Sequence, residues 1–367
     1  YYGMVLALTV VGFVVFEFGL WIWARASRQQ GEPWRRFPLL HLFLAACCCG
    51  IILLPFALPY FQVQRDLGFE RTLADSEPFS ASLQQYLMVP AESAIHGRWL
   101  PSDDTPIVGG YPLDALFLGL LALLLGFWGV VRGSGRTRWF FLLLLAVAFV
   151  LSLGPRLYLA PGQPAGLDAP LPYAWLYAIV PGFKALRAPV RFDAAAMLAL
   201  AVLAGYGMAS LLRLGTTARR WRHAGLVLLL VGLLVLESWV WPAAHVEPVA
   251  VGDKVPPLYR WLADRSEGPV LELPMAFTPG GPRLEYQYLS TYHWQPSPDG
   301  YSGFVPPKHG QVVYEMDRFP WERSVSLLQS LGVQLVTVHT DRYSSSRWLE
   351  MQDLLARTPE FTMVEEW

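Results

Sequence analysis

Three cations stand close together ahead of a long apolar run. Lys184, Arg187 and Arg191 lie in PGFKALRAPVRFD, and AAAMLALAVLAGYGM follows almost at once. Pro189 suits the first position of a helix, where its missing N–H costs nothing. Cations are disfavoured there because unpaired N–H groups already make a helix start positive. A bound anion removes this conflict, since N–H and guanidinium groups bind phosphate together. The pattern therefore predicts a site for a phosphate or a phosphate-linked lipid.

The alternative for these cations is structural. Arg187 and Arg191 would then contact lipid headgroups or pair with Asp193 and nearby carboxylates. Lipid anchoring by cations is commoner on the cytoplasmic side of a membrane, whereas the topology below puts these cations outside.

Other polar residues are weaker candidates. Glu17 precedes Arg25 within an apolar run, at a helical rise of roughly 12 Å, and a carboxylate at that depth is costly unless it is paired or faces a cavity. Glu17 is thus a possible intramembrane polar site or a neutral, hydrogen-bonded structural residue. Glu237 lies nearer the end of its run, and the pair Asp103–Asp104 fits ordinary turn chemistry better than acid–base catalysis.

The sequence contains no recognisable metal-binding or nucleotide-binding motif. The histidines lack the spacing of a zinc site, so no metal site is predicted. Neither a Gly-rich phosphate loop nor a G-x-S-x-G motif is present. The catalytic residue and any cofactor therefore stay unknown at this level.

Composition points to a membrane protein. Of 367 residues, 54% are hydrophobic and 16% charged, against about a quarter charged in soluble domains. The net charge of -1 gives no reason to expect nucleic acid as a partner. The consecutive Cys47, Cys48 and Cys49 sit in an apolar run and predict small core or lipid-facing residues rather than disulfides. The apolar opening without Met leads us to expect a fragment.

About 20 apolar residues cross a membrane, and such runs recur along the chain. We expect six transmembrane helices near 3–23, 39–60, 113–131, 139–159, 191–212 and 224–242. The fifth carries Ala201, Gly205 and Ala209 at four-residue spacing, plus Gly207, which predicts a central helix closely packed through that stripe.

The short loops between alternate spans are rich in Arg. The positive-inside rule makes the loops 24–38, 132–138 and 213–223 cytoplasmic. The outer loops 61–112 and 160–190, and everything after 242, are then outside. Within the second outer loop, 171–183 is apolar but too short to cross, so we expect an interfacial or re-entrant helix.

The tail has a different character from the bundle. Residues 268–274 (GPVLELP) and 333–339 (VQLVTVH) read as strands, and 322–332 reads as a helix that ends at Gly332. We therefore expect a transmembrane bundle over 1–242 and an extracytoplasmic α/β domain over 243–367, with the two strands paired in one sheet.

Several short motifs resemble a known family. LLPFALPYFQ before an outer loop, PGFKALRAPVRF at a helix start, and VLELP, GYSGF and LGVQLVTVH in the tail look like the C-terminal half of bacterial YfhO-type membrane proteins. These belong to the GT-C group of polytopic glycosyltransferases. The resemblance implies a multi-pass protein of the bacterial cytoplasmic membrane that takes a sugar from a polyprenyl-phosphate donor on the outer face for cell-envelope glycan modification.

The resemblance also limits the expectation. GT-C enzymes carry their acidic catalytic residue in the first outer loop, which this chain is expected to lack, so no catalytic residue is carried over. Partners on this reading are the lipid bilayer, the polyprenyl-phosphate sugar and a glycan or lipid acceptor. The alternatives are a transport or polymer-handling membrane protein, with Glu17 on an ion path, and a non-catalytic envelope assembly protein.

Overall fold

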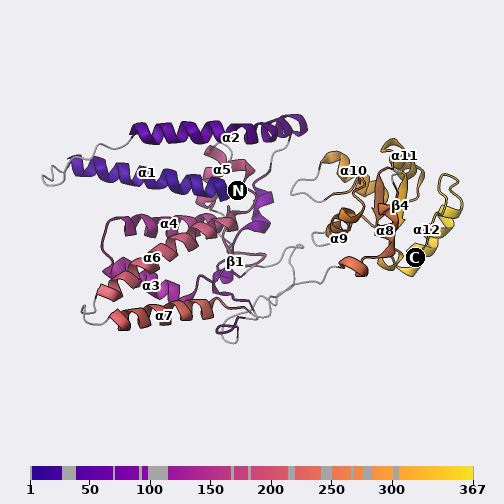
Figure 1. Ribbon diagram of the computed structural model, residues 1–367. Helices are drawn as coiled ribbons and strands as arrows, with labels where there is room; N and C mark the ends of the chain where they lie inside the picture. The colour runs from indigo at the N-terminus through magenta and orange to yellow at the C-terminus, as the bar shows by residue number, and fades with distance from the viewer. Residues whose placement is uncertain are drawn as a thin grey trace. The chain divides into compact units, whose positions relative to one another are not determined.

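The computed structural model divides the chain into two compact units, Tyr1–Ala244 and His245–Trp367 (Figure 1). It describes residues 2–26, 39–68, 71–90, 93–97, 115–166, 169–180, 183–213, 220–240, 250–265, 268–275, 283–300 and 306–366. Helices make up most of this described part. The predicted Asp103–Asp104 turn lies outside it.

In the described part of the chain, three helices are long and apolar enough to cross a membrane. They are α1 (Tyr2–Ala26), α2 (Leu39–Leu67) and α6 (Asp193–Arg213), the last counted from Pro189. Most of the apolar side chains of α2 that the structure describes are exposed, Ile51 by 72% and Phe56 by 70%. Soluble proteins rarely expose an apolar surface of this size to water, whereas such a surface is favourable in contact with the hydrocarbon of a membrane.

Three further apolar helices are shorter. They are α3 (Leu120–Arg132), α4 (Thr137–Ser152) and α7 (Arg220–Glu237). The predicted span 139–159 is wrong at its end, because α4 stops at Ser152 and Gly154 takes a φ of 73° before Pro155. A positive φ is open to glycine but ends a helix. The six-span arrangement as a whole stays a prediction.

Helix α6 packs against both α3 and α4. A Cβ built on Gly129 of α3 would stand 2.7 Å from the backbone nitrogen of Gly207 on α6, so the two backbones meet at these glycines. The predicted stripe of Ala201, Gly205 and Ala209 is wrong, since all three are exposed. Four-residue spacing identified a helix face, but the packed face is the one that carries Leu203 and Gly207.

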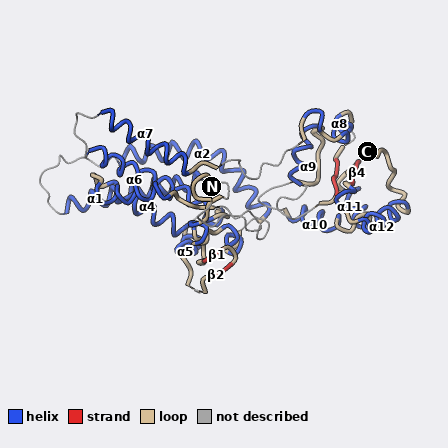
Figure 2. Tube along the Cα trace, turned by 90° about the horizontal axis from the view of Figure 1, so that it is seen from below, coloured by secondary structure: helices blue, strands red, loops and turns tan. Residues whose placement is uncertain are grey.

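Short elements gather beside the helix ends in a region that we call the end layer, the described residues of 71–90 and 153–192 (Figure 2). It comprises η1 (Ala74–Phe79), η2 (Gln84–Leu87), β1 (Tyr158–Ala160), β2 (Gln163–Pro164), α5 (Pro172–Ile179), η3 (Phe183–Ala185) and η4 (Pro189–Phe192). Strands β1 and β2 pair antiparallel. Helix α5 confirms the short helix expected within 171–183.

Backbone hydrogen bonds hold the end layer together. The N–H of Ala81 donates to the carbonyl of Ser152 (2.9 Å), and that of Leu83 donates to the carbonyl of Tyr158 (3.0 Å). The segment 71–90 is therefore tied to the end of α4 and to the β1–β2 hairpin.

The second unit contains a two-stranded parallel sheet. Strand β3 (Val270–Leu273) pairs with β4 (Leu335–Val338), with Val270 opposite Leu335 and Leu273 opposite Val338. The predicted pairing of these segments is confirmed, as is the helix before Gly332, here α11 (Glu322–Ser330). The extracytoplasmic location of this unit stays a prediction.

Helices pack on both faces of this sheet. Leu271 and Leu273 of β3 share a core with residues of α10 (Pro307–Met316), α11 and α12 (Ser345–Ala356). Val270 packs instead with α8 (Pro257–Ala263) and with Leu289 of α9 (Arg283–Leu289). Alternation along β3 thus sends Glu272 to the α8–α9 side.

Candidate functional site

The segment that carries the three predicted cations is firmly held in the end layer. Phe183 and Phe192 are 0% and 3% exposed, and their rings lie 6.2 Å apart. The hydroxyl of Tyr173 in α5 donates to the carbonyl of Leu186 (2.9 Å). Pro189 is buried and occupies the first turn of η4, as predicted for a helix start. The backbone of 183–192 is therefore fixed by buried aromatic side chains.

The cations themselves lie at or near the surface. Lys184 in η3 and Arg191 in η4 are exposed, and Arg187 between them is half-buried. The guanidinium carbon of Arg187 stands 4.0 Å from the ring centroid of Phe79 in η1. A cation over an aromatic face at that distance is attracted by the ring. The structure thus brings Arg187 to the segment 71–90, a contact that sequence spacing could not reveal.

A polar cluster lies at the junction of α6, η2 and α4. The hydroxyls of Tyr86 and Ser152 are 2.6 Å apart. Asp193 begins α6, and its Oδ1 is buried without a hydrogen-bond partner in the described part of the chain. Burial raises the pKa of Tyr86 above its ordinary value, so this hydroxyl stays protonated and can donate. A carboxylate in the first turn also suits the helix dipole and lessens the electrostatic conflict with the cations.

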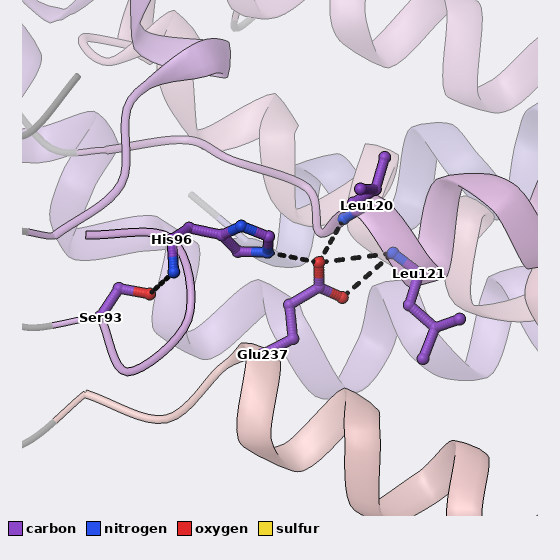
Figure 3. A network of polar contacts seen from close by, with 5 residues as sticks. All are labelled: Ser93, His96, Leu120, Leu121 and Glu237. Atoms are coloured by element: carbon purple, nitrogen blue, oxygen red, sulfur yellow. Dashed lines mark hydrogen bonds and ion pairs between the residues drawn. The ribbon is translucent and has the colours of Figure 1, made fainter. Parts of the chain in front are cut away.

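Glu237 forms a second polar site (Figure 3). From the sequence, this residue was noted only for its position near the end of an apolar run. Its Oε1 accepts the N–H of Leu120 at 2.6 Å and lies 2.8 Å from Nε2 of His96. Its Oε2 accepts the N–H of Leu121 at 3.1 Å. The Glu237 side chain is 7% exposed.

This arrangement is a helix cap made by a distant residue. Leu120 and Leu121 are the first two residues of α3, whose N–H groups have no partner within the helix. Gly119 precedes them with a φ of 88°, which places the chain for the approach of the carboxylate. Glu237 thereby joins the end of α7 to the start of α3, so we assign it a structural role.

The second unit holds a buried carboxylate of its own. Glu272 is 6% exposed, and its Oε2 accepts the hydroxyl of Tyr259 at 2.6 Å and lies 2.9 Å from Nε2 of His339. The ring of Tyr286 stacks on that of His339 with centroids 4.7 Å apart. Sequence analysis missed this cluster, although a lone Glu in an apolar strand and a His just after its partner strand were visible signals.

Electrostatics keep the surrounding groups neutral. Burial, with the Glu272 carboxylate adding to it, raises the pKa values of Tyr259 and Tyr286 above the ordinary tyrosine value. Burial lowers the pKa of His293, which stacks near Tyr259. The neutral hydroxyl of Tyr259 donates to the Glu272 carboxylate, whereas the hydroxyl of Tyr286 is buried without a hydrogen-bond partner among the described residues.

The remaining predicted residues stand apart. Glu17 is half-buried on α1 and makes no hydrogen bond or ion pair with other described residues. The three cysteines are exposed on α2. Among the residues that the structure describes, no three His, Cys, Asp or Glu side chains gather where they could hold a metal ion.

Comparisons with protein-family models, with curated proteins and with solved structures found no match.

Proposed function

We propose that this chain is part of a multi-pass membrane protein that binds a polyprenyl-phosphate-linked sugar donor on the outer face of the membrane, as a GT-C type glycosyltransferase would. Lys184, Arg187 and Arg191 hold the donor phosphate. The observation that carries the proposal is a rigid, buried backbone from Phe183 to Phe192 that presents three cations directly before a membrane-length helix.

The geometry suits a phosphate at the end of a lipid. Two of the cations are exposed, so a headgroup in solvent can reach them, and Arg187 is held by Phe79 rather than free to fold away. A segment whose backbone is already ordered loses little entropy on binding. The apolar surface of the membrane-length helices would lie beside the polyprenyl chain.

Binding of a polyprenyl phosphate to the detergent-purified protein tests the proposal. We expect Arg187→Ala and Arg191→Ala each to weaken binding by about 1.5–3 kcal/mol, the range for hydrogen bonds to charged groups. Arg187→Lys should recover only part of the loss, because Lys keeps the positive charge but lacks the planar fork of the guanidinium group. Arg213→Ala is the matched control, since Arg213 is an exposed Arg at the opposite end of α6.

Two competitors separate the sources of the phosphate. Inorganic phosphate should displace the polyprenyl phosphate only weakly. Phosphatidylglycerol in the same micelles should displace the polyprenyl phosphate no better than inorganic phosphate does. If phosphatidylglycerol competes as well as the polyprenyl phosphate, the cations serve as a general lipid anchor. If both Ala variants bind normally while folded, the phosphate site is wrong.

Glu17 favours a transport role as the second candidate. A half-buried carboxylate within a membrane-length helix, without an ionic partner in the described part of the chain, is the usual mark of an ion or proton path. Reconstituted vesicles that carry a pH-sensitive dye would show proton flux abolished by Glu17→Gln. Absence of flux in the unsubstituted protein would remove this candidate.

A further inference from the structure

A cavity of about 480 Å³ opens in the second unit, beyond the carboxyl end of β3. Pro274 and Met275, which follow β3, form one side of it. Ligands of parallel sheets bind outside the carboxyl ends of the strands, and ligand pockets commonly measure about 300–1,000 Å³. Both the place and the size therefore fit a binding site, and this cavity belongs to neither polar site described above.

The charges that line the cavity cancel. Arg318 and Arg347 contribute two positive groups, and Asp317 and Glu350 contribute two negative ones. Nη1 of Arg347 donates to Oε2 of Glu350 at 2.8 Å, so that pair is neutralised within the wall. A cavity with this balance does not attract a phosphate or any other strongly charged group.

The polar groups are also held in place. Nη2 of Arg347 donates to the carbonyls of Asp317 (3.1 Å) and Phe319 (3.3 Å), which fixes its guanidinium between α12 and the end of α10. Fixed donors beside carboxylate acceptors can bind hydroxyl groups, because a hydroxyl both donates and accepts.

The cavity has an aromatic wall as well. Trp321 lines it with a side chain that is 56% exposed, and Tyr343 and Met316 also face it. An exposed indole beside a cavity offers a flat apolar surface at low cost in conformational entropy. The apolar C–H face of a pyranose ring matches such a surface, and its hydroxyls match the charged rim.

We propose that this cavity binds a neutral oligosaccharide, with a sugar ring stacked on Trp321 and its hydroxyls hydrogen-bonded to Arg347 and Glu350. The inference rests on the second unit alone and is independent of the phosphate site proposed for the first. An acidic glycan would be a different ligand class, and stronger binding of the sulfated probes below counts against the proposal.

Saturation-transfer difference NMR on the whole chain in detergent tests the idea. The probes are neutral gluco-, manno-, galacto- and chito-oligosaccharides, with sulfated forms of each. We expect at least one neutral probe to bind saturably and to be insensitive to salt, because screening acts only on charged partners. Trp321→Ala should weaken that binding about 30-fold, as truncation of a central Trp does in other interfaces.

Trp294→Ala is the matched control, because Trp294 is 81% exposed in the same unit and does not line the cavity. It should bind the probe normally. Trp321→Phe should restore part of the affinity through its smaller ring. The proposal is overturned if no neutral probe binds, if sulfated probes bind better, or if Trp321→Ala binds as well as Trp294→Ala. Polyprenyl-phosphate binding should be unchanged in Trp321→Ala, which separates this test from that of the first site.

Discussion

Gly207→Ala should destabilise the helix bundle although it adds a single methyl group. A Cβ at this position would meet the carbonyl oxygen of Leu125 on α3 and stand 2.8 Å from its carbonyl carbon. Carbon atoms pack best at about 3.5–4.0 Å, so α3 and α6 would have to separate by about 1 Å. The obstacle is backbone, which cannot rotate away as a flexible side chain would.

The expected magnitude follows from two opposed terms. Overpacking a tight interface costs about 1–3 kcal/mol, and a clash with backbone belongs at the upper end. Replacing Gly by Ala inside a helix gains about 1 kcal/mol of helix propensity. The net loss in free energy of unfolding should therefore be about 2 kcal/mol for Gly207→Ala.

Gly205→Ala supplies the control on the same helix. Gly205 is exposed, and a Cβ there would meet nothing within 4 Å, so only the propensity gain applies. Unfolding in mixed micelles by titration with sodium dodecyl sulfate, followed by circular dichroism, measures both variants. Equal stability of the two would refute the close α3–α6 contact, and so would a loss confined to Gly205→Ala.

Three further predictions concern other parts of the molecule. Glu237→Ala should lower the free energy of unfolding by about 1–3 kcal/mol, because two N–H groups of α3 lose their acceptor. Glu237→Gln should recover part of this loss, and an unchanged thermal midpoint in Glu237→Ala would contradict the cap. The free energy of unfolding should fall as pH drops below about 6.5, because burial lowers the pKa of His293 and the unfolded chain then binds the proton more tightly. Nδ1 of His293 also accepts the N–H of Gln295. In chemical denaturation between pH 5 and 8, His293→Asn should flatten the dependence of stability on pH. In a background without the native cysteines, an impermeant thiol reagent added to intact cells should label Ser345→Cys and spare Ser134→Cys, because the loop 132–138 is predicted to be cytoplasmic; the reverse pattern would overturn the topology.

The sequence predicted local structure better than long-range contacts. Hydrophobic run length identified the membrane-length helices, and the β-branched segments around Val270 and Val336 identified paired strands, because these signals come from neighbouring residues. The end of α4 was misplaced because apolar residues resume at Leu157, whereas the helix ends before Gly154, which takes a positive φ.

The candidate sites divide in the same way. The cations before α6 stood out because they are adjacent in sequence, but the ring of Phe79 under Arg187 comes from a segment more than a hundred residues earlier. The partners of Glu237 and Glu272 are likewise remote in sequence, Leu120 for the first and His339 for the second. A single sequence shows that such a carboxylate is unusual, but only the fold shows what satisfies it.

The Glu237 cap also has a mechanical meaning. Just beyond it, the N–H of Ala94 donates to the carbonyl of Trp239 at 3.0 Å, and Ser93 forms a bridge with Val240. Because the second unit follows Val240 in the sequence, any pull exerted on that unit must pass through Val240 before it reaches α7. Under such a pull, the bridge would resist through the 93–97 segment and the Glu237 carboxylate would resist through α3. The contacts at the end of α7 would therefore have to break before tension on the tail could unwind the helix.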